Sequence, residues 1–168
     1  MPPNDHQAQK VACVDCGIVT VSDTRSPDTD TSGALIRELL TTGGHRVVGY
    51  EIVPDEPAGL RERVSAFCTS GTCQAVILTG GTGLAPRDTT YETLAALLDK
   101  RIDGFGELFR MLSYREIGPA AMLSRAVAGV FRGTVVFSLP GSTAAVRLAM
   151  ERLILPQIGH TVWLLQRS

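Results

Sequence analysis

The sequence lacks the features that would assign it to a membrane or to a nucleic acid. None of its apolar runs approaches the roughly 18 residues that a membrane-spanning helix needs. Its first ten residues lack the apolar core of a signal peptide. The 16 basic and 17 acidic residues leave a net charge of -1 and are scattered, so there is no basic patch for nucleic acid or an anionic membrane. We expect a cytoplasmic protein that binds anionic small molecules locally.

Several common catalytic motifs are also absent. There is no G-x-x-x-x-G-K-[ST] sequence, which disfavours an ordinary P-loop nucleotidase. The run Gly80-Gly81-Thr82-Gly83 lacks the G-x-G-x-x-G pattern of a dinucleotide-binding fold, and Ser142 does not lie in a G-x-S-x-G elbow. The three histidines share no spacing that suggests a metal site or a base, so we assign them no role.

Cysteine is scarce, with four residues in the chain. Cys13 and Cys16 have the C-x-x-C spacing of a zinc knuckle or a redox pair, and Cys68 and Cys73 are two further candidate ligands. The second pair is separated by four residues, and Cys16 is expected in a buried strand while Cys13 precedes it. Structural or free thiols therefore fit the sequence better than a metal cluster.

The most informative segment that is present runs from Val76 to Asp88. A short β-rich apolar stretch leads directly into the glycine-rich run 80–83, followed by Arg87 and Asp88. Glycines let main-chain N–H groups approach a ligand without a Cβ in the way, and Thr79 and Thr82 add hydroxyl groups. The segment predicts an anion-binding junction between a strand and a loop.

The residues after this loop predict a helix that begins just past Asp88. Thr89-Thr90-Tyr91-Glu92 has the Thr-x-x-Glu form of a capping box and leads into a leucine-rich stretch. The positive end of the helix dipole would favour the same bound anion as the glycine loop. An ordinary tight turn between a buried strand and its crossover helix is the alternative interpretation.

The first half of the chain alternates strand and helix patterns. The predicted strands cover residues 17–21, 46–53 and 75–79. Ser32 is predicted to cap the helix after the first strand, and Pro57 to open the helix after the second, which runs to about Cys68. This βαβαβ order implies parallel strands joined by right-handed crossovers, with helices on both faces of the sheet.

The second half adds helices to this pattern, and also two strands that can form a hairpin. We predict short helices over 107–114 and 119–125, strands over 127–130 and 134–139, a helix over 143–155 and a last helix that opens at Pro156. We therefore expect one antiparallel strand at the edge of the sheet. The predicted fold is α/β: a three-layer α/β/α domain over residues 15–168 with a mostly parallel, mixed central sheet, after a disordered leader over residues 1–14.

Parallel strands bring separate loops together at the carboxyl edge of a sheet. Ser22 and Asp23, Asp55, and the segment 79–88 each follow one of the predicted parallel strands. Mg²⁺ binds through one or two carboxylates together with phosphate oxygens of a substrate. Asp55 and Asp88 therefore predict a magnesium site that a nucleotide completes, although a plain turn residue is the alternative for Asp55.

Five motifs occur in an order that resembles a known family. They are Val21-Ser22-Asp23-Thr24-Arg25, Val53-Pro54-Asp55-Glu56, Thr79-Gly80-Gly81-Thr82-Gly83 with Pro86-Arg87-Asp88, Gly104-Phe105-Gly106-Glu107, and Leu139-Pro140-Gly141-Ser142. The chain resembles the MoaB/Mog group of molybdenum cofactor biosynthesis proteins, whose best understood members are molybdopterin adenylyltransferases. The resemblance extends from Cys16 nearly to the end of the chain.

The resemblance implies attack of the molybdopterin terminal phosphate on the α-phosphorus of ATP, with release of pyrophosphate and a requirement for Mg²⁺. Because this nucleophile is already anionic, alignment and charge neutralisation are expected to carry catalysis. Asp55 and Asp88 resemble the two essential aspartates of the family. The implied substrate-binding residues are Ser22, Asp23, Thr79, Gly80, Gly81, Thr82, Gly83, Arg87, Glu107, Pro140, Gly141 and Ser142.

Three of these assignments have local alternatives. Arg87 either neutralises phosphate charge or forms an exposed ion pair with Asp88, which would contribute roughly 0 to 1 kcal/mol. The segment 140–142 either binds an anion or the pterin, or is a turn that caps the next helix. Phe105 either lines the pocket, with Glu107 near the ligand, or fills the core.

The resemblance also bears on assembly and activity. Members of the MoaB/Mog family form trimers or dimers of trimers, so the resemblance implies a homo-trimer or homo-hexamer. Residues 113–119 and 127–139 are closer to the B branch than to the Mog branch. Some B proteins have uncertain activity, so a non-catalytic oligomer that binds molybdopterin or nucleotide is the alternative function.

Overall fold

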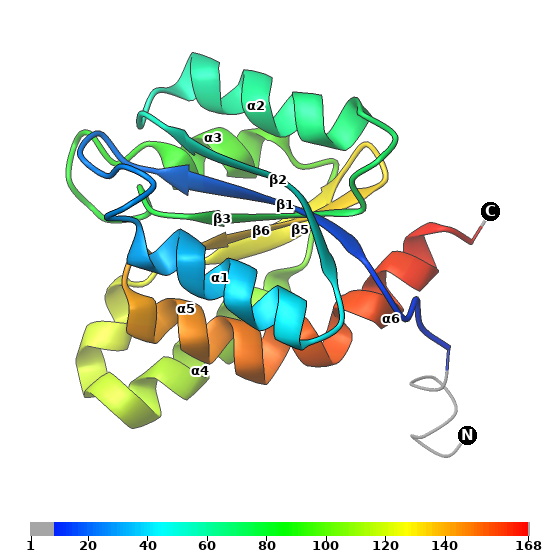
Figure 1. The fold of residues 1–168 in the computed structure, drawn as a ribbon. Coiled ribbons are helices and arrows are strands. Elements are labelled where there is room, and N and C mark those ends of the chain that lie inside the picture. Colours follow the sequence, from blue (N-terminus) through cyan, green and yellow to red (C-terminus); the bar gives the residue numbers. More distant parts are fainter. Residues whose placement is uncertain (1–8, 168) are drawn as a thin grey trace.

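A six-stranded sheet forms the centre of the protein, whose computed structural model describes residues 9–167 (Figure 1). The strand order is β2-β1-β3-β6-β5-β4. The strands are β1 (Asp15–Val21), β2 (Arg46–Val53), β3 (Ala75–Thr79), β4 (Lys100–Arg101), β5 (Val127–Phe131) and β6 (Thr134–Leu139). The helices are α1 (Thr31–Thr42), α2 (Pro57–Thr69), α3 (Thr90–Leu97), α4 (Asp103–Ile117), α5 (Thr143–Ala149) and α6 (Leu155–Leu165).

The sheet is mostly parallel, as predicted, but its antiparallel strand does not lie at the edge. β2, β1, β3 and β6 pair in parallel, while β5 is antiparallel to both of its neighbours, β6 and β4. The two-residue strand β4 forms the edge and covers β5. No apolar pattern marks such a short edge strand, and the sequence prediction therefore omitted it.

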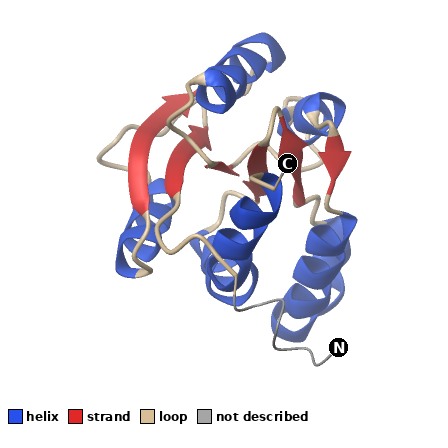
Figure 2. Cartoon of the chain, turned by 90° about the vertical axis from the view of Figure 1, so that its right-hand side faces the viewer, coloured by secondary structure: helices blue, strands red, loops and turns tan. Residues whose placement is uncertain are grey.

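Helices cover both faces of the sheet, which confirms the predicted three-layer α/β/α architecture (Figures 1 and 2). On one face α1, α4, α5 and α6 pack over alternate strand residues such as Ile18, Ile77 and Phe137. On the other face α2 and α3 cover the intervening residues, among them Val19 and Leu78. Because the central strands are buried on both sides, their sequences are continuous apolar runs rather than alternating ones.

Residues 11–14 are ordered, so the predicted leader over 1–14 is wrong in this part. The Val11 N–H donates to the Gly159 carbonyl at 3.0 Å, and Val14 is fully buried. The Val14 N–H also donates to Nδ1 of His45 at 3.1 Å. The apolar run Val11-Ala12-Cys13-Val14 is only four residues long, which is too short a signal to predict this docking. Residues 1–8 of the predicted leader lie outside the described residues.

Two helical segments differ from prediction in their extent. Helix α4 begins at Asp103, four residues earlier than predicted, and ends at Ile117, because the next residue, Gly118, has a φ of 64° that stops the helix. A 3₁₀ helix, η1, then covers Gly118–Leu123. Between α5 and α6 the chain continues through a single π-helical segment, η2 (Met150–Ile154), so the last helix begins at Leu155 rather than at Pro156.

The N-cap of α1 is Asp30, not Ser32 as predicted. The Asp30 carboxylate accepts a hydrogen bond from the Gly33 N–H at 3.0 Å. Ser32 already lies inside the helix, and its hydroxyl donates to another segment described below. Both residues are good N-cap types, so local sequence alone could not separate them.

Asp30 is also the centre of a buried hydrogen-bond network. The hydroxyls of Thr20 and Tyr50 both donate to its Oδ2 at 2.5 Å, and Arg25 pairs with its Oδ1 at 3.3 Å. Burial by itself raises the pKa of this carboxyl, but the hydrogen bonds from Thr20, Tyr50 and Gly33, with the charge of Arg25, outweigh it and lower the pKa. Asp30 therefore stays ionised although its side chain is fully buried.

The cysteines are free thiols, as the sequence favoured. Cys16, Cys68 and Cys73 are buried and Cys13 is exposed. Burial raises the pKa of Cys68 to about 11 and also raises those of Cys16 and Cys73. Protonated thiols are poor metal ligands. Separately, the helices between residues 9 and 167 include none that is both long and apolar enough to cross a membrane.

We expect Gly49→Ala to destabilise the protein by about 1 to 3 kcal/mol, because the Phe67 ring lies against Gly17 and Gly49, which are paired across β1 and β2. A Cβ at Gly49 would overlap this ring. The free energy of unfolding in urea measures the effect. The control is Gly59→Ala in α2, where a Cβ meets no atom within 4 Å. Equal stability of Gly49→Ala and the wild type would contradict the packing of Phe67.

We expect Asp30→Asn to reduce the loss of stability in acid. The pKa of Asp30 is lowered in the folded protein. Its contribution to the free energy of unfolding is therefore complete above the unfolded-state pKa of about 3.9 and is lost as the pH falls through the folded-state pKa. The measurement is the difference in unfolding free energy between pH 7 and pH 3, which should be smaller in the variant. Asp103→Asn, at an exposed carboxylate, is the control. An unchanged difference would show that Asp30 is not held as a carboxylate.

Candidate functional site

The loops after β1, β2, β3 and β6 meet at the carboxyl edge of the sheet, as predicted from the strand order. They lie together at the left of Figure 1. The Ser22 N–H donates to the Val53 carbonyl at 2.9 Å, and the Gly80 N–H donates to the Leu139 carbonyl at 3.0 Å. Backbone hydrogen bonds therefore join these loops in pairs directly beyond the ends of the strands.

The loop after β3, Gly80–Gly83, requires glycine at its first two positions. Gly80 has a φ of 103° and Gly81 a φ of 67°, values that side chains other than glycine rarely adopt. A Cβ on Gly80 would collide with the Val21 carbonyl, and one on Gly81 would collide with Asp55. Close packing against β1 and against Asp55 thus determines the path of this glycine loop.

The glycine loop presents backbone donors that the protein itself does not use. The N–H groups of Gly81, Thr82, Gly83 and Leu84 have no acceptor among residues 9–167. Thr82 is buried nevertheless. Consecutive free N–H groups of this kind form an anion-binding concavity.

A cavity of about 420 Å³ is lined by the glycine loop and by the loop after β6. Residues of α4 and η1, including Phe109, Ser113 and Leu123, form its far wall. Other lining residues are Gly80, Gly81, Thr82, Gly83, Asp88, Pro140, Gly141 and Ser142. The structure therefore brings eight of the predicted site residues to one cavity, which we name the loop cavity.

Side chains behind the loop Pro140–Ser142 hold its carbonyl groups. The Thr79 hydroxyl donates to the Pro140 carbonyl at 3.0 Å. The Ser32 hydroxyl donates to the Gly141 carbonyl at 2.7 Å, and Arg25 donates to the same oxygen at 3.2 Å. Thr79 thus holds this loop through its hydroxyl, and its predicted contact with substrate stays a prediction. Ser142 caps α5, as its alternative interpretation stated, by accepting from the Ala145 N–H at 3.2 Å.

Asp55 lies between the glycine loop and the start of α3. Its Oδ1 accepts from the Thr89 hydroxyl at 2.7 Å and from the Thr90 hydroxyl at 3.4 Å, and both of its oxygens are 3.3 Å from the Thr89 nitrogen. The predicted capping box is therefore wrong, because the Thr89 side chain donates to Asp55 and Glu92 pairs with Arg125. A carboxylate from another loop caps this helix.

Asp88 lies on the other side of the glycine loop and lines the loop cavity. Its Oδ2 accepts from the Ala85 N–H at 3.1 Å and covers Gly83, where an added Cβ would be 2.5 Å from this oxygen. Its Oδ1 has no hydrogen-bond partner in the described part of the chain. The two aspartates therefore flank the glycine loop rather than form a cluster.

The oxygen atoms of these aspartates suit a hard divalent cation. Within residues 9–167, no group of three His, Cys, Asp or Glu side chains could hold a metal ion. Asp88 Oδ1 is nevertheless free of described partners, and Asp55 Oδ2 receives only the Thr89 N–H. Mg²⁺ accepts such carboxylate oxygens and fills its remaining positions with water and phosphate. The donor set thus fits an ion whose coordination a nucleotide completes.

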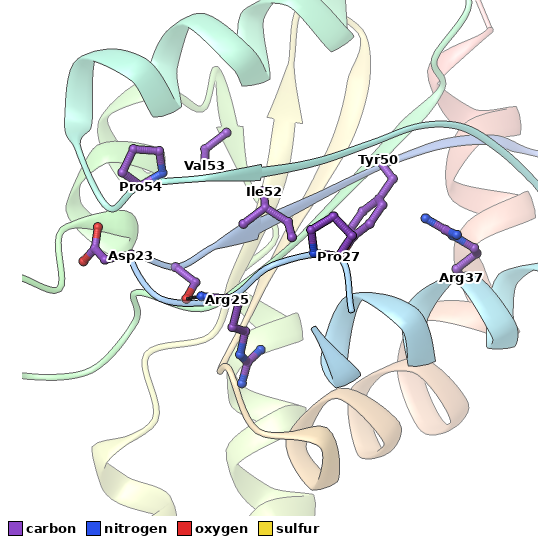
Figure 3. A pocket seen from close by; sticks show the side chains of 9 residues that line it. Asp23, Arg25, Pro27, Arg37, Tyr50, Ile52, Val53 and Pro54 are labelled. Atoms are coloured by element: carbon purple, nitrogen blue, oxygen red, sulfur yellow. Dashed lines mark hydrogen bonds between the residues drawn. The ribbon is translucent and has the colours of Figure 1, made fainter. Parts of the chain in front are cut away.

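Ser22 and Asp23 line a second cavity, of about 570 Å³, whose lining side chains are drawn in Figure 3. The Ser22 hydroxyl accepts from the N–H groups of Thr24 and Arg25 and so shapes its own loop. Asp23 accepts from the Asp55 N–H at 3.3 Å and pairs with Arg87. Of the two alternatives for Arg87, the ion pair forms with Asp23 rather than with Asp88, and neutralisation of phosphate charge stays a prediction.

Glu107 lies apart from these loops. It is exposed on α4 and lines a smaller, polar cavity with Tyr91, Arg101 and Arg110. Phe105 is buried and packs its ring edge-on against Phe137, so its core interpretation holds. Glu107 was expected near the ligand; the structure places it in this smaller cavity and not among the residues that line the loop cavity, and its role in substrate binding stays a prediction.

Sequence reasoning missed two neighbouring residues of the site. Ser124 lines the loop cavity, and its covered hydroxyl has no hydrogen-bond partner among the described residues. Arg125 binds the carbonyls of Thr82 and Gly83. Both residues follow η1, far from the glycine loop in sequence, and no local pattern connects them with it.

Comparison with known proteins agrees with this architecture. The sequence model of a family described as "Probable molybdopterin binding domain" matches residues 17–160. Molybdenum cofactor biosynthesis protein B of Halalkalibacterium halodurans is 51% identical over 163 residues, which cover 96% of each chain.

Solved structures show the same likeness. A crystal structure of a molybdenum cofactor biosynthesis protein B has a TM-score of 0.90 and 53% identity, with coverage of 92% of this chain and 97% of that one. The tungsten cofactor synthesizing protein MoaB of Pyrococcus furiosus has a TM-score of 0.78 and 39% identity over 87% of this chain and 92% of its own. The chain therefore belongs to the molybdopterin-binding family that contains the MoaB and Mog proteins, and within it lies close to the B proteins.

Proposed function

We propose that this protein acts in molybdenum cofactor biosynthesis and transfers the adenylyl group of ATP to molybdopterin, with release of pyrophosphate in a Mg²⁺-dependent reaction. The observation that carries the proposal is the arrangement around the loop cavity. Two adjacent loops, whose carbonyl groups accept hydrogen bonds from side chains, line this cavity, and Asp55 and Asp88 flank the glycine loop. Both proposed substrates carry phosphate groups that such loops bind.

The chemistry requires little from the side chains. The terminal phosphate of molybdopterin is already anionic and needs no general base before it attacks the α-phosphorus of ATP. The protein has to hold two anions in line and offset their repulsion, which free N–H groups such as those of Gly81, Thr82 and Gly83 do. The O–P bond to the leaving pyrophosphate breaks as the new O–P bond forms.

Asp55 and Asp88 are the residues that would hold Mg²⁺ together with the nucleotide. A bound Mg²⁺ supplies charge neutralisation for the phosphate oxygens and the leaving pyrophosphate. Thr89 and Thr90 orient the Asp55 carboxylate through their hydroxyl groups. The Ala85 N–H orients Asp88 in the same way.

We also propose that the protein assembles as a homo-trimer or homo-hexamer. Six large apolar side chains are exposed on α4 and η1: Leu108, Met111, Tyr114, Ile117, Met122 and Leu123. Contiguous exposed apolar surface of this kind is typical of contact sites. Ile117 and Leu123 also line the loop cavity, so a second copy on this face would lie at its rim.

Asp88→Asn is expected to keep the fold and to reduce turnover at least tenfold. The substitution removes charge beside the loop cavity but leaves the buried core untouched, because Asp88 lies in a loop. The measurement is pyrophosphate release from molybdopterin, ATP and Mg²⁺, with the unfolding free energy measured in parallel. Wild-type turnover in Asp88→Asn would remove this residue from the mechanism.

The same assay tests the function itself. Asp103→Asn, an exposed carboxylate on α4, is the matched control and should turn over as the wild type does. If the wild-type protein binds ATP and molybdopterin but releases no pyrophosphate, the protein is a binding module and the proposed transferase activity is wrong.

Light scattering should give a mass of three or six times 17.9 kDa. Met122→Asp is expected to shift this mass toward the monomer, since Met122 is 78% exposed and belongs to this set of exposed apolar side chains. Leu164→Asp, on α6 and away from this face, should keep the wild-type mass. A wild-type monomer at micromolar concentration would exclude the proposed assembly.

A further inference from the structure

Arg125 is bound on every nitrogen of its guanidinium group. Its Nε donates to the Thr82 carbonyl at 3.0 Å, and its Nη2 donates to the Gly83 carbonyl. Its Nη1 pairs with Glu92, and the hydrogen bond from Arg125 lowers the pKa of that carboxyl group. The guanidinium carbon lies 5.0 Å from the centre of the Tyr91 ring. Because the group is planar and anchored on three sides, it holds the two carbonyls at defined positions.

Because the peptide bond is planar, the hydrogen bonds from Arg125 to these carbonyls also fix the direction of the N–H groups in the same peptides. In a trans peptide the carbonyl of one residue and the N–H of the next point in opposite directions. Holding the carbonyls of Thr82 and Gly83 against Arg125 therefore turns the N–H groups of Gly83 and Leu84 away from it. Neither N–H has an acceptor among residues 9–167.

The loop on the other side of the cavity has the same construction. Arg25 is paired with the carboxylate of Asp30 and donates to the Gly141 carbonyl. The Ser142 N–H belongs to the same peptide and so points away from Arg25; it too has no acceptor in the described part of the chain. Each loop thus has an arginine, anchored by a carboxylate, behind its carbonyl groups.

Arg125 is placed behind the loop rather than beside a ligand. It is absent from the residues that line the loop cavity, although its neighbour Ser124 is one of them. Its side chain is 21% exposed, whereas the side chain of Arg87 is 72% exposed. An arginine that bound the anion directly would present free N–H groups to the cavity.

We propose that Arg125 is a positioning residue: it holds the carbonyls of Thr82 and Gly83 so that the free N–H groups of the glycine loop point to a phosphate group in the loop cavity. The inference rests on the proposed function only in taking a phosphate group as the ligand. Glu92 and Tyr91 orient the guanidinium. The specificity of the loop for an anion then depends on a residue that does not touch the anion.

The test uses full-length protein and inorganic pyrophosphate as the probe. Isothermal titration is expected to show at least tenfold weaker binding by Arg125→Ala. Arg125→Lys, which keeps the charge but cannot reach two carbonyls and Glu92 together, should weaken binding at least fivefold. The amide ¹H–¹⁵N resonances of Gly83 and Leu84 should shift in both variants without pyrophosphate. Arg63→Ala, which removes an arginine paired with Glu51 on the surface, is the control and should bind as the wild type does.

Three outcomes would overturn the inference. Wild-type affinity in Arg125→Ala is one, and complete rescue by Arg125→Lys, which would show that only charge matters, is another. Failure of the wild-type protein to bind pyrophosphate is the third. If the wild type binds pyrophosphate and the variants behave as expected but no transfer from ATP to molybdopterin occurs, the proposed function is wrong and the role of Arg125 is supported.

Discussion

The orientation of a few peptide groups is the constraint on which the rest of this structure depends. At the carboxyl edge of the sheet, the carbonyls of Thr82, Gly83, Pro140 and Gly141 each accept a hydrogen bond from a side chain behind the loop. The N–H groups of the same peptides have no acceptor among residues 9–167. A loop without these contacts could turn its carbonyl oxygens toward the cavity, and an anion would then meet negative rather than positive partial charge.

The buried carboxylate of Asp30 connects these oriented peptide groups with the rest of the fold. Asp30 caps α1, binds Arg25 and accepts from the hydroxyl of Tyr50 on the edge strand β2. A buried carboxylate of this kind is tolerated because each of its oxygens has donors. The same carboxylate therefore sets the start of a helix and the position of the arginine behind the loop after β6. Stability and site geometry share one network here.

Much of the fold followed from local sequence because its signals are strong. The strands β2, β3 and β6 were predicted with their observed bounds, and the continuous apolar runs indicated a sheet that is covered on both faces. The errors occur where two residues compete for one role or where the signal is short. Ser32 and Asp30 are both good N-cap residues, β4 has only two residues, and the apolar run 11–14 has only four.

For the candidate site, local sequence predicted the glycine loop and the two aspartates, because glycines and acidic residues directly follow the predicted parallel strands. Only the tertiary structure decided which residues surround them. Glu107 lies in another cavity, and Arg87 forms its ion pair with Asp23. Arg125 and Ser124 lie at the glycine loop although they are more than forty positions away from it along the chain. The physical reason is that a hydrogen bond depends on distance and direction in space, and a one-dimensional pattern records neither for residues that meet only after the sheet has formed.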